Sequence, residues 1–245
     1  MLELPPFLLF DLDDTLVVFS SGRDDLWEEL SRRFAPRLAL NVTPLLAALR
    51  AAADDFWRDP ETKDSGRLEL VRSRRIIVER ALRTLNSHRV AVGQEMADTF
   101  TWTREQRVAP LPGALETLTT LRARGHRLGL VTNGSGPFQR RKIERFGFAQ
   151  YFDDIRVEGE QGLGKPHSPV FEAALAALGA RPQETWMVGD NLVADIAGAQ
   201  AVGIRGVWVD IRGQGGPPAD GPQPDVILDS VSDLVSTPPR ARGPR

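Results

Sequence analysis

Residues 7–10, Phe-Leu-Leu-Phe, form a run with no polar side chain, and an aspartate follows immediately. A run this short and apolar on both faces is typical of a strand that is buried on both sides of a parallel sheet. Similar runs occur at 127–132, 185–189 and 204–209, with a weaker one at 225–228. The chain is therefore predicted to contain a sheet that is covered on both faces.

Helical patterns separate the later strands. Leucine spacing or a terminal glycine predicts helices over 113–124, 138–146, 169–178 and 191–202. Strands that alternate with helices of this length indicate βαβ units, whose crossovers are almost always right-handed. The predicted fold class is therefore α/β, with a doubly wound, Rossmann-like parallel sheet.

Residues 17–108 interrupt this alternation because they look helical throughout. We expect four helices, at about 23–35, 44–58, 66–85 and 93–106, with breaks at Pro36, Pro44, Pro60, Gly66 and Gly93. Since the first strand precedes them, this helical bundle must be an insertion into the α/β domain. The expected division is a core of 1–17 and 108–236, a helical insertion of 18–107, and a disordered tail of 237–245 that is basic and rich in proline.

Composition excludes several classes of function. The 31 basic and 33 acidic residues give a net charge of −2, which creates no field to attract nucleic acid or a membrane surface. Cysteine is absent, so disulfides, thiolate metal sites and a cysteine nucleophile are excluded. The chain has no apolar stretch long enough to span a bilayer and no secretory leader pattern, so we expect a cytoplasmic protein.

The first apolar run ends in a cluster of acids, Asp11-Leu-Asp13-Asp14. Ligands of open α/β sheets bind outside the carboxyl ends of the strands, where this cluster lies. Carboxylates placed so close together repel one another unless a cation is present, and Mg²⁺ is commonly held by one or two carboxylates with a phosphate. Taken alone, such a cluster is better explained as an acidic turn that caps the next helix.

Three further strand or helix boundaries carry chemistry-bearing side chains. The second run ends in Thr132-Asn133-Gly134, where a hydroxyl and backbone N–H groups can hold phosphate oxygens. Lys165 opens a later helix, and its retention is notable in a chain with 28 Arg but only three Lys. Asp190 follows another strand and is placed to complete a cation site, with Asp195 in the next helical turn.

This ordered set of motifs resembles that of the haloacid dehalogenase-like hydrolases. The motifs are Asp-x-Asp-x-Thr, a strand-end Thr, a Lys and a Gly-Asp-x-x-x-x-Asp pair, and the resemblance covers residues 7–235. It implies a phosphatase-type member of the branch with a C1-type cap, and the helical insertion resembles that cap. Its Phe-Asp-Leu-Asp-Asp-Thr-Leu form is similar to that of cytosolic sugar-phosphate and nucleotide phosphatases.

The resemblance implies a mechanism in two displacements. Asp11 would attack phosphorus to give an aspartyl-phosphate. Asp13 would protonate the leaving alcohol and then deprotonate the attacking water. Mg²⁺ would be held by Asp11, the main-chain carbonyl of Asp13 and Asp190, which makes it the expected cofactor.

The same resemblance assigns the phosphate-binding groups. Thr132, the N–H of Asn133 and Lys165 would hold the equatorial oxygens, where charge accumulates. Asp195 would support the site by steering Lys165 or a metal-bound water. The cap would exclude water and select the leaving group.

The expected function is hydrolysis of a small phosphorylated metabolite, such as a sugar phosphate, a phosphoglycolate-like compound or a nucleoside monophosphate, by a monomer or homodimer. A 2-haloacid dehalogenase is an alternative, although halide leaves without a proton and would make Asp13 superfluous. A phosphomutase would use the same aspartyl-phosphate. A phospho-accepting receiver-type switch, or a metal-binding scaffold without turnover, are further alternatives, but neither accounts for the large helical insertion.

Overall fold

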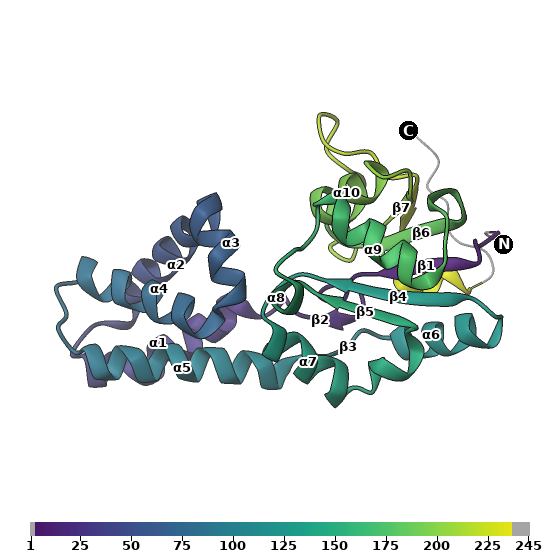
Figure 1. Cartoon of the computed structure of the whole chain (residues 1–245). Helices are drawn as coiled ribbons and strands as arrows, with labels where there is room; N and C mark the ends of the chain where they lie inside the picture. Colours follow the sequence, from purple (N-terminus) through teal and green to yellow (C-terminus); the bar gives the residue numbers. More distant parts are fainter. Residues whose placement is uncertain (1–2, 237–245) are drawn as a thin grey trace. The chain divides into compact units, whose positions relative to one another are not determined.

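The computed structural model describes residues 3–236 (Figure 1), so the tail expected over 237–245 lies outside the described residues. The chain divides into two compact units. An α/β unit joins the residues up to Phe19 with those from Ala109 onward, and a helical unit spans Ser20–Val108. The helical unit begins two residues later and ends one residue later than the expected insertion of 18–107.

The α/β unit is built on a six-stranded parallel sheet with the order β5-β4-β1-β6-β7-β8. The strands are β1 (Phe7–Phe10), β4 (Arg127–Thr132), β5 (Asp154–Val157), β6 (Thr185–Gly189), β7 (Arg205–Val209) and β8 (Val226–Leu228). A separate antiparallel pair consists of β2 (Val17–Val18) and β3 (Ala109–Pro110). The predicted fold class is confirmed.

Helices cover both faces of this sheet (Figure 1). One face carries α9 (Ser168–Leu178) and α10 (Gly198–Gln200). α10 continues a π-helical segment over Leu192–Ala197. The other face carries α6 (Ala114–Ala123) and α7 (Gly136–Arg145). Shorter helical turns are α8 (Glu158–Gln161) and the 3₁₀ segments Phe148–Tyr151, Pro182–Glu184 and Val231–Leu234. Leu9 and Met187, paired across β1 and β6, pack with Phe171 of α9 in a buried cluster.

The strand order reverses at β1. The chain places β4 and β5 on one side of β1 and then returns to place β6, β7 and β8 on the other. The carboxyl ends of β4, β1 and β6 therefore lie side by side at the position where open α/β sheets bind ligands. Asp11, Thr132 and Asp190 stand at these three ends.

The helical unit contains five helices where four were expected. They are α1 (Arg23–Leu38), α2 (Val42–Arg58), α3 (Pro60–Leu68), α4 (Leu70–Thr84) and α5 (Val90–Arg107). The expected break at Pro60 is confirmed, since α2 ends at Arg58 and a new helix begins at Pro60, but the expected break at Gly66 is wrong. Pro60 is the first residue of α3, whose N–H at Glu61 is capped by the Asp59 side chain at 3.1 Å. Gly66 lies inside α3. The residue is a glycine there for lack of space, because a Cβ would come within 2.6 Å of the Phe56 ring.

Two other expected breaks also fall within helices. Pro36 lies in the last turn of α1, which ends two residues later at Leu38. Gly93 lies in α5, where a Cβ would meet Leu82 of α4 at 2.5 Å. Close approach of two helices, rather than a turn, accounts for this glycine. The buried side chains of α1, α2, α4 and α5 form the core of the helical unit.

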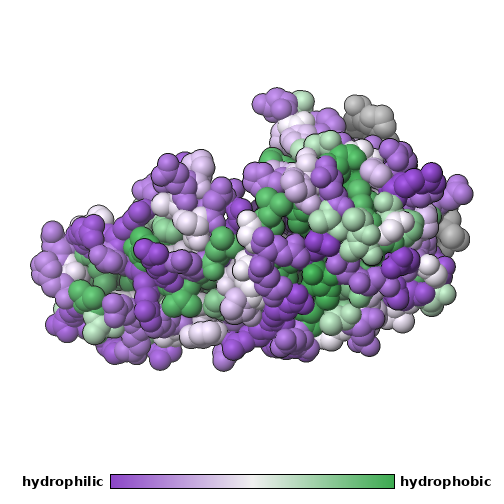
Figure 2. Space-filling view, viewed as in Figure 1, coloured by the Kyte–Doolittle hydropathy of each residue, from purple (hydrophilic) through white to green (hydrophobic). Residues whose placement is uncertain are grey.

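Hydrophilic residues cover most of the outline of each unit in the view of Figure 2, with hydrophobic residues showing between them. In the part of the chain that the structure describes, the large hydrophobic side chains that are exposed to solvent are those of Val90, Trp102 and Val193. Among the described residues, no helix combines the length and the apolar character that a membrane crossing requires.

Candidate active site

The acidic cluster lies on a tight turn after β1. The N–H of Asp11 donates to the Val188 carbonyl of β6 at 2.9 Å, which extends the sheet pairing to this residue. Asp14 then adopts a left-handed conformation with φ of 59°, which aspartate tolerates better than most residues, and its N–H donates to the Val17 carbonyl at 2.7 Å. The turn thus fixes Asp11 at the strand end and presents Asp13 beyond it.

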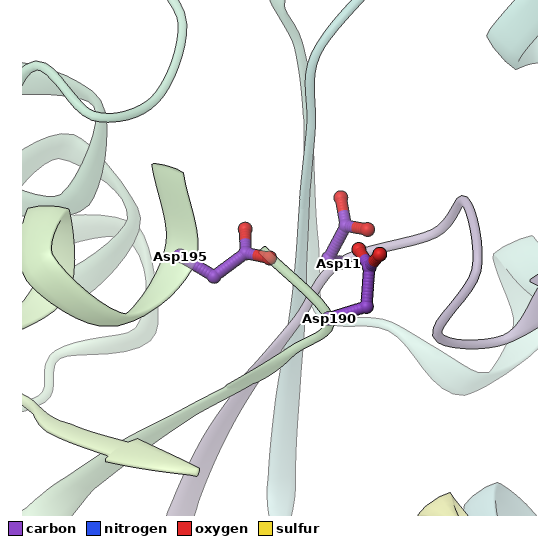
Figure 3. A group of neighbouring side chains, drawn as sticks. All are labelled: Asp11, Asp190 and Asp195. Carbon is purple, nitrogen blue, oxygen red and sulfur yellow. The ribbon is translucent and has the colours of Figure 1, made fainter. Parts of the chain in front are cut away.

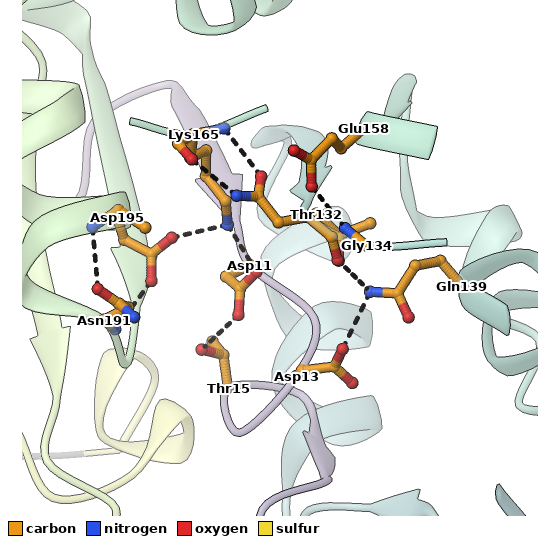
Figure 4. Close-up of polar contacts among 12 residues, drawn as sticks. Asp11, Asp13, Thr15, Thr132, Gly134, Gln139, Glu158, Lys165, Asn191 and Asp195 are labelled. Carbon is orange, nitrogen blue, oxygen red and sulfur yellow. Dashed lines mark hydrogen bonds and ion pairs between the residues drawn. The ribbon is translucent and has the colours of Figure 1, made fainter. Parts of the chain in front are cut away.

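A buried ammonium group connects two of the acids (Figure 4). Lys165 Nζ lies 2.6 Å from Asp11 Oδ1 and 2.7 Å from Asp195 Oδ1, and the lysine side chain is 2% exposed. Burial raises the pKa of Asp11 to about 7, although Lys165 opposes this rise; the charges of Asp195 and Asp13 add to it. The two carboxylates raise the pKa of Lys165 above its ordinary value against the effect of burial. Lys165 therefore stays charged.

Asp190 completes a group of three carboxylates (Figure 3). Asp11, Asp190 and Asp195 each offer an oxygen, and these oxygens lie within 4.8 Å of one another. Burial, followed by the charges of Asp11, Asp195 and Asp14, raises the pKa of Asp190 to about 8. One ammonium does not neutralise three carboxylates, so the donor set suits a hard divalent cation.

The structure groups the metal-binding candidates differently from the predicted set. Asp195 takes part in the cluster, whereas the carboxylate of Asp13 turns toward α7. Asp195 also accepts a hydrogen bond from the Asn191 N–H at 2.9 Å, so its oxygens are engaged by Lys165 and Asn191. The prediction that the Asp13 carbonyl is a metal ligand stays a prediction.

The loop after β4 is locked to the Lys165 segment. The Asn133 side chain donates to the Lys165 carbonyl at 2.7 Å and accepts from the Lys165 N–H at 2.8 Å. Glu158, which was not predicted, accepts the N–H of Gly134 at 2.9 Å, so this N–H is directed into the protein (Figure 4). Thr132 is buried at the strand end beside this loop.

Sequence reasoning also missed two residues of α7. Gln139 donates to Asp13 Oδ2 at 3.0 Å and contacts Thr132 Oγ1 at 2.5 Å (Figure 4), while Lys142 Nζ lies 2.6 Å from Asp13 Oδ1. A signal was present in the sequence. Lys142 is one of only three lysines in an arginine-rich chain, and the argument that singled out Lys165 applies to it equally.

Comparison with known sequences agrees with this geometry. A family model described as haloacid dehalogenase-like hydrolase matches residues 7–203. A phosphoserine phosphatase of Thermus thermophilus is 44% identical over 118 residues, which are 48% of this chain and 47% of that protein. The pyrimidine 5′-nucleotidase YjjG of Escherichia coli is 27% identical over 229 residues, covering 93% of this chain and 95% of that protein. The chain spans about half the length of the first curated relatives that it matches.

Solved structures show the same architecture. A 2-haloacid dehalogenase of Pseudomonas syringae pv. tomato has a TM-score of 0.62 and 26% identity, covering 93% of this chain and 95% of its own. The HAD hydrolase YfnB of Bacillus subtilis has a TM-score of 0.68 and 21% identity, covering 95% and 97% respectively. The fold is thus shared along nearly the whole chain.

Proposed function

Because the chain belongs to the haloacid dehalogenase-like hydrolases, we propose that this hydrolase is a Mg²⁺-dependent phosphatase that cleaves a small phosphorylated metabolite through an aspartyl-phosphate. One observation carries the proposal. Asp11 and Asp13 are two residues apart in the sequence but lie in separate environments. The Asp11 carboxylate forms an ion pair with buried Lys165, whereas the Asp13 carboxylate contacts side chains of α7. Two carboxylates held in different surroundings suit the separate tasks of nucleophile and acid–base.

Each carboxylate has a defined part in the two displacements. In the first, a carboxylate oxygen of Asp11 forms a bond to phosphorus while the ester oxygen leaves and takes a proton from Asp13. In the second, water attacks phosphorus and gives its proton to Asp13, which restores Asp11 and releases phosphate. A halide leaving group needs no such proton, and this favours phosphate over a haloacid as the substrate.

Lys165 is suited to hold the phosphate. An ammonium carries three hydrogens, and Asp11 and Asp195 engage two of them. The third remains for an equatorial phosphate oxygen, which the Thr132 hydroxyl and the Asn133 N–H would also bind. Asp195, engaged on one side by the Asn191 N–H, orients the ammonium for this task.

The carboxylates of Asp11 and Asp190, with the Asp13 carbonyl, would hold Mg²⁺. When bound, the ion would offset the repulsion between the nucleophile and the anionic substrate. The raised pKa values of Asp11 and Asp190, about 7 and about 8, support this assignment, because burial and, to a smaller extent, the neighbouring carboxylates disfavour the charged forms that a bound cation would stabilise.

The relatives support a proposal for the class of substrate. The relatives include phosphatases for phosphoserine, glyceraldehyde 3-phosphate and ribulose 1,5-bisphosphate, and a pyrimidine 5′-nucleotidase. All of these substrates are phosphomonoesters of small metabolites. We place the substrate of this chain among sugar phosphates, phosphoglycolate-like compounds and nucleoside monophosphates, with the helical unit acting as a cap that selects among them.

Phosphate release tests the proposal. The protein is assayed with p-nitrophenyl phosphate and a panel of phosphorylated metabolites, with Mg²⁺ and with a chelator, and with a 2-haloacid in parallel. We expect Mg²⁺-dependent phosphate release, which Asp11→Asn abolishes and which Asp220→Asn, at an exposed loop position, leaves intact. Activity of Asp11→Asn within about tenfold of wild type, a barrier change of only ~1.4 kcal/mol, would refute the nucleophile assignment. Halide release without phosphate release would establish the dehalogenase instead.

A further inference from the structure

We propose that Gln139 and Lys142 of α7 are positioning residues that hold Asp13 in the orientation needed to pass a proton to and from the reacting oxygen. This inference rests on the proposed function, in which Asp13 is the acid and base. Neither residue belongs to the sequence motifs that suggested the chemistry. Both belong to the α/β unit, as Asp13 does.

The three side chains form a closed ring of polar contacts. Lys142 Nζ lies 2.6 Å from Asp13 Oδ1, Gln139 Nε2 donates to Asp13 Oδ2 at 3.0 Å, and Lys142 Nζ donates to Gln139 Oε1 at 2.8 Å. Each carboxyl oxygen of Asp13 therefore has one donor from α7. A carboxylate oxygen has two lone-pair sites, so each keeps one for the proton that the reaction moves.

Burial makes this arrangement rigid. Gln139 and Lys142 are each only 2% exposed, while the Asp13 side chain is 22% exposed and open to a ligand. The face of the Phe19 ring lies 4.0 Å from Lys142 Nζ and shields the ammonium further. Because residues three apart share one face of a helix, α7 presents both donors to Asp13 together. An ammonium is costly to bury, so its placement here indicates a specific role for its charge.

Gln139 also connects the proton donor to the phosphate-binding loop. Its Nε2 contacts Thr132 Oγ1 at 2.5 Å and the Asn133 carbonyl at 2.9 Å in addition to Asp13. An amide nitrogen has two hydrogens for these three acceptors, so they compete for the same group. Because Gln139 contacts both Asp13 and the residues that would hold the phosphate, it sets the position of Asp13 relative to them. An error of about 1 Å in such a position can reduce a rate 10²-fold.

The test compares leaving groups, because only esters with poor leaving groups need the proton. We would measure kcat and KM for p-nitrophenyl phosphate and for the best alkyl phosphate of the panel, in single-turnover and steady-state experiments. The variants are Lys142→Met, Lys142→Gln and Gln139→Leu, with Asp13→Ala as the reference. Lys63→Met, at an exposed position of α3, removes a lysine elsewhere and serves as the matched control.

Asp13→Ala should reduce alkyl-phosphate turnover by about 10²–10⁴-fold and the first step with the aryl ester far less. We expect the α7 variants to reduce kcat for the alkyl ester by about 10-fold to 10²-fold, with KM and the aryl first step nearly unchanged. Lys142→Gln should be the milder of the two lysine variants because it keeps a donor. A loss that is equal for both esters would be structural and would overturn the inference.

The failure of this inference is distinguishable from failure of the proposed function. If Asp13→Ala changes the alkyl-to-aryl ratio but the α7 variants do not, positioning by α7 is refuted and the phosphatase mechanism stands. If Asp13→Ala leaves the ratio unchanged, the acid role itself is refuted, and the α7 inference falls with it. Circular dichroism and melting temperatures establish that each variant is folded; if a lysine variant does not fold, Gln139→Leu alone decides the outcome.

Discussion

Replacing Lys165 with methionine removes the positive charge between two buried carboxylates and keeps a side chain of similar length. The ammonium lies 2.6 Å from Asp11 and 2.7 Å from Asp195. At an effective dielectric constant of about 20, each contact is worth roughly 6 kcal/mol before solvation is considered. The several kcal/mol needed to strip water from the ammonium offset much of this gain, and breaking such a buried pair typically costs about 3–5 kcal/mol. We expect a loss in that range at high pH.

The loss should depend on pH through Asp11. The pKa of Asp11 is about 7 in the folded protein, against an ordinary value of 3.8, and Lys165 holds it down from a still higher value set by burial. Without Lys165 the folded-state pKa rises further, so the variant keeps a proton that wild type releases above pH 7. The wild-type advantage contributed by Asp11 is therefore absent below about pH 7 and grows as the pH rises above it.

Urea unfolding of the metal-free proteins, followed by circular dichroism at pH 6 and pH 9, measures this difference. Lys165→Met should be less stable than wild type by about 3–5 kcal/mol at pH 9 and by distinctly less at pH 6. Lys63→Met, on the exposed surface of the helical unit, should stay within about 0.5 kcal/mol of wild type at both pH values. A Lys165→Met difference below about 1 kcal/mol, or one that does not change with pH, would refute this account of the site.

Two further expectations concern the metal site and the helical unit. Asp11 and Asp190 have pKa values of about 7 and about 8 in the folded protein, against an ordinary value of 3.8, so the folded state binds their protons more tightly than the unfolded state does. The free energy of unfolding of the metal-free protein should therefore fall between about pH 4 and pH 8, by at most ~1.4 kcal/mol per pH unit for each group. Chemical denaturation across this range, with and without Mg²⁺, checks this, and a loss that Mg²⁺ does not reduce would contradict the cation site. Gly66→Ala should cost about 1–3 kcal/mol, because its Cβ would lie 2.6 Å from the Phe56 ring; an unchanged melting temperature would show that the ring moves aside freely.

The central strands were predictable, and one edge strand was not. The runs that became β1, β4 and β6 are apolar because helices cover both faces of the sheet at these positions. β5, with the sequence Asp-Ile-Arg-Val, lies at the sheet edge and is half-buried over most of its length. Its polar residues pair locally, Arg156 Nε lying 2.7 Å from Asp154 Oδ2, so the short strand leaves no apolar run to detect.

The helical breaks were harder to place for a different reason. A glycine in a sequence signals either freedom of the backbone or lack of space for a side chain, and only the packed neighbours distinguish the two. Gly66 and Gly93 belong to the second kind, since Phe56 and Leu82 occupy the volume that a Cβ would need. Pro60, in contrast, stands at the expected break, because it begins α3 directly after the residue that caps the end of α2.

In the candidate site, the residues at strand ends were proposed because the end of a buried strand is marked in the sequence by the change from an apolar run to polar residues. Gln139 and Lys142 lie within a helix, 126 and 129 residues from the aspartate that they contact. No local pattern encodes a contact over that distance. Such partners emerge only from the packing of α7 on one face of the sheet, although the rarity of lysine marked one of them.

The small antiparallel pair formed by Val17–Val18 and Ala109–Pro110 has a consequence for how this chain can evolve. It holds the outgoing and returning segments of the inserted helices next to each other, so the insertion leaves from and rejoins the α/β unit at neighbouring points. An insertion with adjacent ends can be lengthened, shortened or exchanged without altering the order or register of the parallel strands. Lineages that keep this junction are therefore free to recruit different inserted modules, while the residues at the strand ends keep their arrangement.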